Sequence, residues 1–139
     1  MSKVKTRSGE PEDDDISTPP ELYAELDAEF KFDFDPCPLR ASFNGLIMPW
    51  GASNYVNPPY NRRDKPKFIN KAREEQLKGN TSVLLIPAAT GTKQFHDVIL
   101  PNAEVRFLKG RVRFWKDGTP MKSKGKHDSM VCVFRGDAK

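Results

Sequence analysis

The chain has 139 residues, of which 30% are charged and 37% are hydrophobic, and its formal net charge is +4. This length suits one domain, and such a domain buries roughly two-thirds of its unfolded surface, so it needs no disulfide or metal staple. No apolar run reaches the length of a membrane span and the N-terminus has no signal-peptide core, which indicates a cytoplasmic protein without a membrane partner. The modest basic excess permits nucleic-acid binding without establishing it.

Residues 1–15 contain almost no apolar side chains, so we expect a disordered tail followed by a single domain over residues 16–136. Cys37 and Cys132 lie far apart without a CxxC pattern, which favours two reduced thiols. The two histidines have no neighbours at metal-ligand spacing, and we expect no metal site.

The first predicted elements are a helix and a strand. Thr18-Pro19-Pro20-Glu21 has capping-box spacing with prolines in the first turn, which predicts a helix over residues 19–29 with Thr18 as a suitable cap. Apolar and charged residues then alternate strictly over 30–35, which predicts a strand. Two prolines in Asp35-Pro36-Cys37-Pro38 end that strand because they cannot support regular pairing.

The remaining elements alternate between strands and helices before three closing strands. The unbroken apolar run at 82–86 is typical of a strand covered on both faces, as in parallel sheets. The other predicted elements are strands at 54–56, 103–108, 110–115 and 129–135 and helices at 65–78 and 92–99. This order predicts an α/β fold with a mostly parallel sheet, an antiparallel edge and helices on both faces.

Asn57-Pro58-Pro59-Tyr60 is the most informative motif, because it follows a predicted strand and precedes a predicted helix. Ligand sites in open α/β sheets lie at this carboxyl end of the strands. The Asn57 side-chain carbonyl and the Pro58 backbone carbonyl can accept hydrogen bonds from an aromatic amine, while Pro58 and Pro59 fix the backbone. Tyr60 offers a ring on which a base can stack. We predict that all four residues are catalytic.

The motif is that of amino-group methyltransferases, and the wider chain resembles the bacteriophage DNA adenine-N6 methyltransferase family over roughly residues 16–135. The stretches that carry the resemblance are Thr18-Pro19-Pro20-Glu21-Leu22, Phe32-Asp33-Phe34-Asp35-Pro36-Cys37-Pro38, Gly45-Leu46 with Trp50, Tyr55-Val56-Asn57-Pro58-Pro59-Tyr60, Leu84-Leu85-Ile86-Pro87-Ala88, Val105 to Phe114, and Ser129-Met130-Val131-Cys132-Val133-Phe134. The motif alone is shared with other amino-methyltransferases, whereas this ordered set is far more specific.

The resemblance implies a minimal Rossmann-like methyltransferase fold, S-adenosylmethionine as cofactor and flipping of the target adenine out of the DNA duplex. It implies that the cofactor contacts Thr18 and Pro19, the turn Asp35-Pro36-Cys37, and Asn57. For Asp35, a simple turn residue is an equal alternative. The chain departs from the family pattern in three ways, of which the first is Asn44, where the family often has Asp before Gly-Leu. No Gly-x-Gly loop follows the first strand, and the short segment from Pro38 to Leu46 leaves no room for a second strand carrying the acid that holds the cofactor ribose.

Phosphate contacts are expected from basic side chains near the motif, on the late strands and in the lysine-rich loop that follows them. These candidates are Arg62, Arg63, Lys109, Arg111, Arg113, Lys122, Lys124 and Lys126. Arg111 and Arg113 alternate with apolar residues, so we expect both on one strand face; an ordinary solvated face is an equal alternative.

Two alternative functions remain open at this point. The same chemistry suits other planar amines, such as RNA adenine, cytosine N4 or a protein glutamine, and the short cofactor region also allows an inactive, basic DNA-binding module. A monomer or a homodimer is compatible with the length of the chain, since a second copy could complete a DNA cleft.

Overall fold

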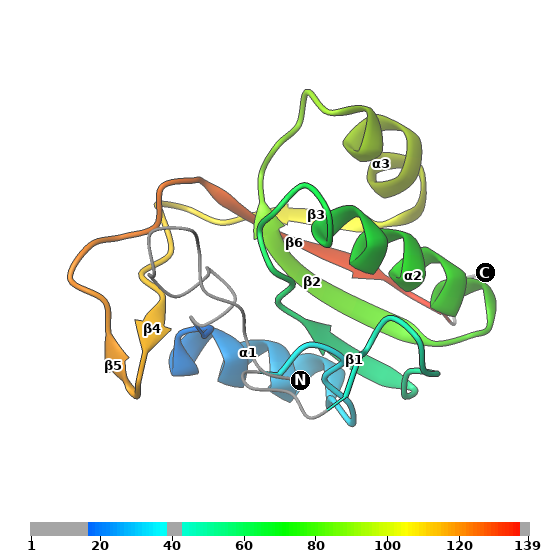
Figure 1. Cartoon of the computed structure of the whole chain (residues 1–139), viewed down its shortest axis with the longest axis horizontal. Coiled ribbons are helices and arrows are strands. Elements are labelled where there is room, and N and C mark those ends of the chain that lie inside the picture. The colour runs from blue at the N-terminus through cyan, green and yellow to red at the C-terminus, as the bar shows by residue number, and fades with distance from the viewer. Residues whose placement is uncertain (1–16, 39–42, 137–139) are drawn as a thin grey trace.

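The computed structural model describes residues 17–38 and 43–136, so the predicted tail lies outside the described residues. Its helical elements are α1 (Pro20–Phe30), α2 (Lys65–Leu77), the π-helix η2 (Phe95–Ile99) and α3 (Leu100–Asn102). Its strands are β1 (Ser53–Val56), β2 (Thr81–Pro87), β3 (Glu104–Phe107), β4 (Trp115–Lys116), β5 (Thr119–Pro120) and β6 (Ser129–Phe134). The α/β class is therefore confirmed (Figure 1). Within the described part of the chain, no helix has the length and apolar character that crossing a membrane requires.

The main sheet has the strand order β1-β2-β6-β3. β1 pairs parallel with β2, whereas β6 pairs antiparallel with both β2 and β3, so β1, β2 and β3 run in one direction. The prediction of an antiparallel edge was wrong, because the antiparallel strand β6 lies inside the sheet. The physical reason is burial: every residue of β6 is buried, whereas β3 carries Glu104 and Arg106, charges that suit an exposed edge.

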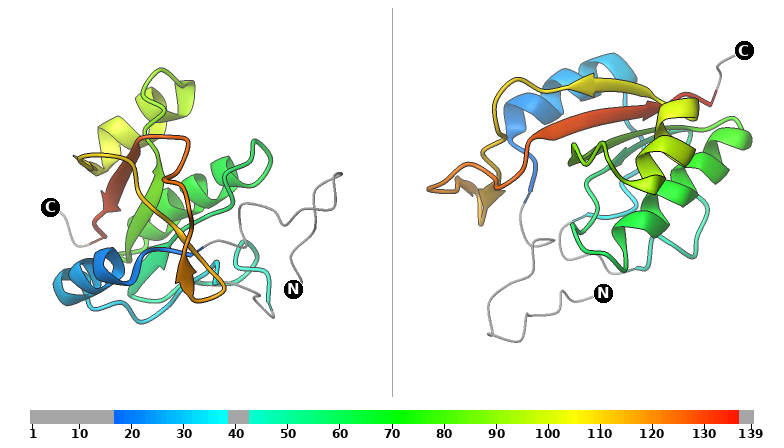
Figure 2. Two further views of the ribbon diagram at one scale, coloured as in Figure 1. Left: turned by 90° about the vertical axis from the view of Figure 1, so that its left-hand side faces the viewer. Right: turned by 90° about the horizontal axis from the view of Figure 1, so that it is seen from above.

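Helices cover both faces of this sheet, as predicted (Figure 2). Alternate residues of β2 and β6 belong to two separate clusters, one on each face. On one face Val83 and Leu85 pack with Leu26 of α1. On the other face Leu84 and Ile86 pack with residues of α2 and η2. Because both faces are apolar, the sheet needs a helical layer on each side, and α1 has a fixed place under β1 and β2.

Residues 30–35 do not form the predicted strand. Phe30 ends α1, and Lys31 takes a left-handed conformation with φ of 51° that turns the chain away from the helix. What remains of the strand is a single parallel bridge between Phe34 and Asn54, supported by the bond from the Tyr55 N–H to the Phe34 carbonyl at 3.1 Å. The residues do alternate between aromatic and charged, but Phe30 belongs to α1 and Lys31 ends that helix, so the first residues of the pattern are not free to form a strand.

The predicted strand at 110–115 was also wrong. This segment bonds to the loop that follows it instead of to the main sheet: the Gly125 N–H donates to Val112 and the Met121 N–H donates to Phe114. Only Trp115 and Lys116 belong to a strand, β4, which pairs with β5 in a separate two-stranded sheet. The strands at 54–56, 82–86, 103–108 and 129–135 and the helices at 19–29 and 65–78 agree with the structure within a few residues. The short helix predicted at 92–99 extends through α3.

The described residues 43–52, which lead into β1, pack back onto the turn at Asp35 and Pro36. Trp50 is buried, donates its indole N–H to the Gly45 carbonyl at 2.8 Å and stacks on Phe68. Burial alone would raise the pKa of the neighbouring carboxyl Glu75, but bonds and charges from Asn80, Lys78, Lys71 and the Trp50 backbone hold that pKa below its usual value. A side chain at Gly45 would place its Cβ 1.8 Å from the Pro36 carbonyl oxygen, so only glycine fits there.

We predict that Gly45→Ala lowers the free energy of unfolding by about 1–3 kcal/mol, since the backbone must shift to relieve the overlap. Gly91→Ala is the matched control, because a Cβ at Gly91 would meet no atom within 4 Å. Urea unfolding monitored by tryptophan fluorescence measures both changes. Equal stability of the two variants would contradict the close packing of this segment on Pro36.

Candidate functional site

The motif Asn57-Pro58-Pro59-Tyr60 connects β1 to the segment that leads into α2, at the carboxyl end of β1. Pro58 and Pro59 are buried, while Asn57 and Tyr60 are half-buried. Since proline has no N–H and a fixed φ, two buried prolines hold this strand end rigidly without leaving buried donors unpaired. The motif therefore presents two polar side chains on a stiff backbone.

Asn57 and Thr18 lie together although 39 positions separate them in the sequence. The Asn57 side-chain amide donates to the Thr18 hydroxyl at 3.4 Å, and that hydroxyl also bonds to the Tyr55 hydroxyl. The sequence suggested Thr18 as the cap of α1, but Thr18 does not cap this helix. Pro19 occupies the N-cap position without a side-chain bond, and its carbonyl accepts a hydrogen bond from the Tyr23 N–H. The Thr18 hydroxyl is thus directed to the end of β1 and away from its own helix.

The turn at Asp35 lies on the same side of the site. The Cys37 N–H donates to the Asp35 carboxylate at 2.8 Å, which fixes the turn around buried Pro36. The Tyr55 N–H donates to the carbonyl of Phe34, the residue before Asp35, so the turn begins beside Tyr55. Burial raises the pKa of Tyr55 strongly, and the Asp35 carboxylate raises it further. The structure thereby gathers Thr18, Asp35 and Asn57 around Tyr55.

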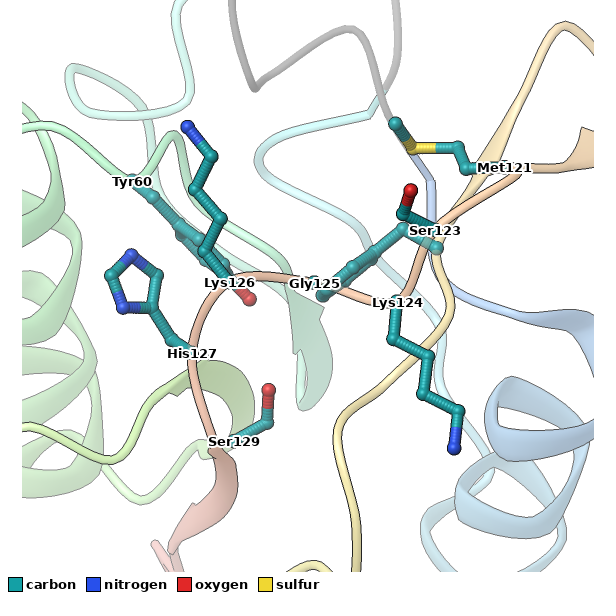
Figure 3. A pocket seen from close by; sticks show the side chains of 9 residues that line it. Tyr60, Met121, Ser123, Lys124, Gly125, Lys126, His127 and Ser129 are labelled. Carbon is teal, nitrogen blue, oxygen red and sulfur yellow. The ribbon is translucent and has the colours of Figure 1, made fainter.

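Tyr60, the last residue of the motif, borders a cavity of about 410 Å³ (Figure 3). Its hydroxyl donates to the Leu85 carbonyl at 3.0 Å, and its ring meets Phe114 edge-to-face with 6.1 Å between centroids. The other lining residues are Met121, Ser123, Lys124, Gly125, Lys126, His127 and Ser129. This volume is that of a small-molecule site. Sequence reasoning missed Phe114 and Ser129, because only the folded loop brings them to Tyr60.

All the predicted DNA-binding side chains are exposed, but their surroundings differ. Arg63 pairs with Asp64 at 3.1 Å, and Arg111 lies 3.6 Å from Asp128. Lys124 and Lys126 both line the cavity, yet their side chains point to opposite sides of the loop in Figure 3. The prediction that Arg111 and Arg113 share a strand face was wrong, because residues 111–114 form no strand.

Arg113 is engaged with the backbone of its own loop. Its Nη1 atom donates to the Met121 carbonyl at 2.8 Å and to the Lys122 carbonyl at 2.6 Å. These bonds tie the segment before β4 to the segment after β5, directly beside the cavity wall. Arg113 therefore shapes the cavity, a role that sequence spacing did not indicate.

A second group of charged residues, which sequence reasoning did not find, ties α1 to the sheet edge. Arg106 of β3 forms a bidentate pair with Glu29 of α1, with both distances 2.7 Å, and its Nε donates to Glu104. Arg135 pairs with Glu104 at 3.1 Å, and the guanidinium groups of both arginines lie over the Phe30 ring. Since Thr18 precedes α1, anchoring this helix also helps to anchor Thr18.

The motif at the end of β1, the mixed sheet and the cavity beside Tyr60 define an α/β protein with a candidate ligand site at the carboxyl end of β1. The family described as DNA N-6-adenine-methyltransferase (Dam) matches residues 5–138, nearly the whole chain. The chain belongs to this family, which confirms the resemblance to DNA adenine-N6 methyltransferases. No curated protein matches the chain, and no solved structure matches it.

We predict that Arg113→Ala loosens the loop around the cavity, because two backbone carbonyls lose their donor. Hydrogen exchange of amides in residues 114–127 should accelerate by about tenfold. Arg111→Ala removes the same charge two residues earlier and should leave exchange in this loop close to that of the unmodified protein. Equal exchange in the two variants would show that the Arg113 bonds do not hold the loop.

Proposed function

We propose that this protein transfers a methyl group from S-adenosylmethionine to the N6 amino group of adenine in DNA, with residues 16–136 acting as one domain. The observation that carries the proposal is the position of Asn57. Its amide nitrogen is engaged by Thr18, and the rigid Pro58-Pro59 backbone follows it at the strand end. Membership of the DNA N-6-adenine-methyltransferase family supports adenine in DNA as the substrate.

The proposed role of the motif follows from the chemistry of adenine N6. This nitrogen is a weak nucleophile, since its lone pair is delocalised into the ring. The Asn57 side-chain oxygen and the Pro58 carbonyl would accept hydrogen bonds from its two N–H groups, which localises the lone pair and stabilises the positive charge that develops on the nitrogen. Because the Asn57 amide nitrogen donates to Thr18, its oxygen is turned away from Thr18 and toward the rest of the site.

The side chains around Tyr55 fit the amino-acid part of S-adenosylmethionine. A carboxylate at Asp35 complements an ammonium group, and the Thr18 hydroxyl offers a donor and an acceptor beside Asn57. Pro19, Pro36 and Cys37 would line the same position. The cofactor supplies an electrophilic methyl group on sulfur, and these residues would orient it toward the motif.

The cavity bordered by Tyr60 is the proposed place for the flipped adenine. Base flipping costs a few kcal/mol of unstacking, and stacking on an aromatic ring returns about 1–3 kcal/mol per base. The Tyr60 ring is held at its hydroxyl by Leu85 and at its edge by Phe114, so it is oriented before the base arrives. Exposed Arg62, Lys109 and the lysines of the loop would contact phosphates.

Transfer of tritium from labelled S-adenosylmethionine to unmethylated DNA, with nucleoside analysis of the product, tests the proposal. We expect label in N6-methyladenine, and we expect Asn57→Ala to lose at least about a thousandfold in rate, because one of the two acceptors of the amine is removed. Asn70→Ala, on the exposed side of α2, is the control and should retain full activity. Label in N4-methylcytosine would show that cytosine is the target base, and label in RNA would show that RNA is the substrate; either result would contradict the proposal.

We also predict that replacing Lys122, Lys124 and Lys126 with alanine weakens DNA binding and reduces the slope of log affinity against log salt by up to about three, roughly one per phosphate contact. The control replaces Lys67, Lys78 and Lys93, which changes the net charge equally on other surfaces. Fluorescence anisotropy over a salt series measures both slopes. The same slope in both triple variants would exclude specific phosphate contact by the loop.

A further inference from the structure

Ser129, the first residue of β6, is a buried serine whose hydroxyl has no hydrogen-bond partner among the residues that the structure describes. The residue is 2% exposed and lines the cavity beside Tyr60. Its backbone is satisfied as part of the sheet, with its carbonyl accepting from the Leu108 N–H at 3.1 Å. Within residues 17–38 and 43–136, in contrast, no group forms a hydrogen bond with its side-chain oxygen.

The other buried polar side chains of the sheet region are all paired. Asn54 donates to the carbonyls of Gly51 and Thr81, Ser82 accepts from Asn54, and Glu75 accepts from Asn80. A buried hydroxyl without a partner costs free energy, and in native proteins such a group calls for a specific explanation. Figure 3 shows the Ser129 oxygen directed into the cavity, on the side of the Tyr60 ring. A ligand in the cavity would supply the missing partner.

The register of the sheet places Ser129 on the same face as the catalytic motif. Tyr55, Val83 and Val133 are paired in a row and belong to one cluster, and Val131 belongs to it as well. Residues two apart on a strand share a face, so Asn57 follows Tyr55 on this face and Ser129 precedes Val131 on it. β1 and β6 are separated by β2 alone, a spacing of about 10 Å between the two strands. A purine with its amine at Asn57 is long enough to reach toward Ser129.

We propose that the Ser129 hydroxyl donates a hydrogen bond to a ring nitrogen of the target adenine and helps to select that base. The proposal rests on the proposed function, because it assigns the cavity to the flipped base. Adenine ring nitrogens are acceptors, and a serine hydroxyl can donate to them. The rings of Tyr60 and Phe114 form the apolar wall beside the base, while the Ser129 hydroxyl forms a hydrogen bond with its edge.

Stability and activity together test this role. Ser129→Ala removes a hydroxyl that has no protein partner, so the midpoint of urea unfolding should stay the same or rise, while kcat/KM for methyl transfer falls by about tenfold. Ser82→Ala is the matched control: it removes a buried serine hydroxyl of the neighbouring strand that accepts a bond from Asn54. That variant should unfold at lower urea and keep its kcat/KM per folded molecule. A clear loss of stability in Ser129→Ala would indicate a structural hydroxyl and overturn the proposal.

Substrates containing 1-deaza-, 3-deaza- or 7-deazaadenine at the target position identify the contact. One of these analogues should slow the unmodified protein by about tenfold yet slow Ser129→Ala no further, since the bond is already lost. If each analogue slows Ser129→Ala by the same factor as it slows the unmodified protein, Ser129 does not contact the base, although the methyltransferase assignment stands. If the unmodified protein methylates no DNA, the proposed function fails and the role of Ser129 fails with it.

Discussion

The paired strands β2 and β6 are the constraint from which the rest of the structure follows. Six consecutive residue pairs join them, from Ser82 with Phe134 to Pro87 with Ser129, and nearly every residue is buried. A ladder that is apolar on both faces must be covered twice, and in this small chain α1 covers one face while α2 and η2 cover the other. The position of α1 then decides where Thr18 lies, because Thr18 immediately precedes that helix.

The site depends on this arrangement more than on any single bond. Tyr55 lies in the cluster that packs on α1, and its buried hydroxyl meets Thr18, which in turn meets Asn57. The arginine–glutamate group at the other end of α1 fixes the helix against β3 through exposed but multiply connected ion pairs. Individual exposed ion pairs contribute little, whereas a bidentate network stacked on Phe30 restrains the helix from several directions.

The two polar residues of the motif have different neighbours. Asn57 bonds to Thr18, and Tyr60 borders the cavity formed with the loop between β3 and β6. The rigid prolines between them keep the two residues fixed relative to each other. The proposed methyl transfer likewise needs two ligands, a methyl donor near the start of α1 and a target base in the cavity. The thiol of Cys132, whose pKa burial raises to about 12, lies in the core.

The sequence by itself determined the α/β class, most of the helices and strands, the family and the place of the motif at a strand end. The class, the elements and the place of the motif follow from local periodicity and from proline and glycine positions, which act over a few residues, whereas the family follows from the resemblance of the ordered stretches. Only the tertiary structure decided that β6 lies inside the sheet, that Thr18 bonds Tyr55 in place of capping its helix, and that Arg113 holds backbone carbonyls. It alone brought Phe114 and Ser129 to Tyr60, 54 and 69 positions away in the sequence. Such contacts depend on how both faces of the sheet are covered, and no local pattern specifies them.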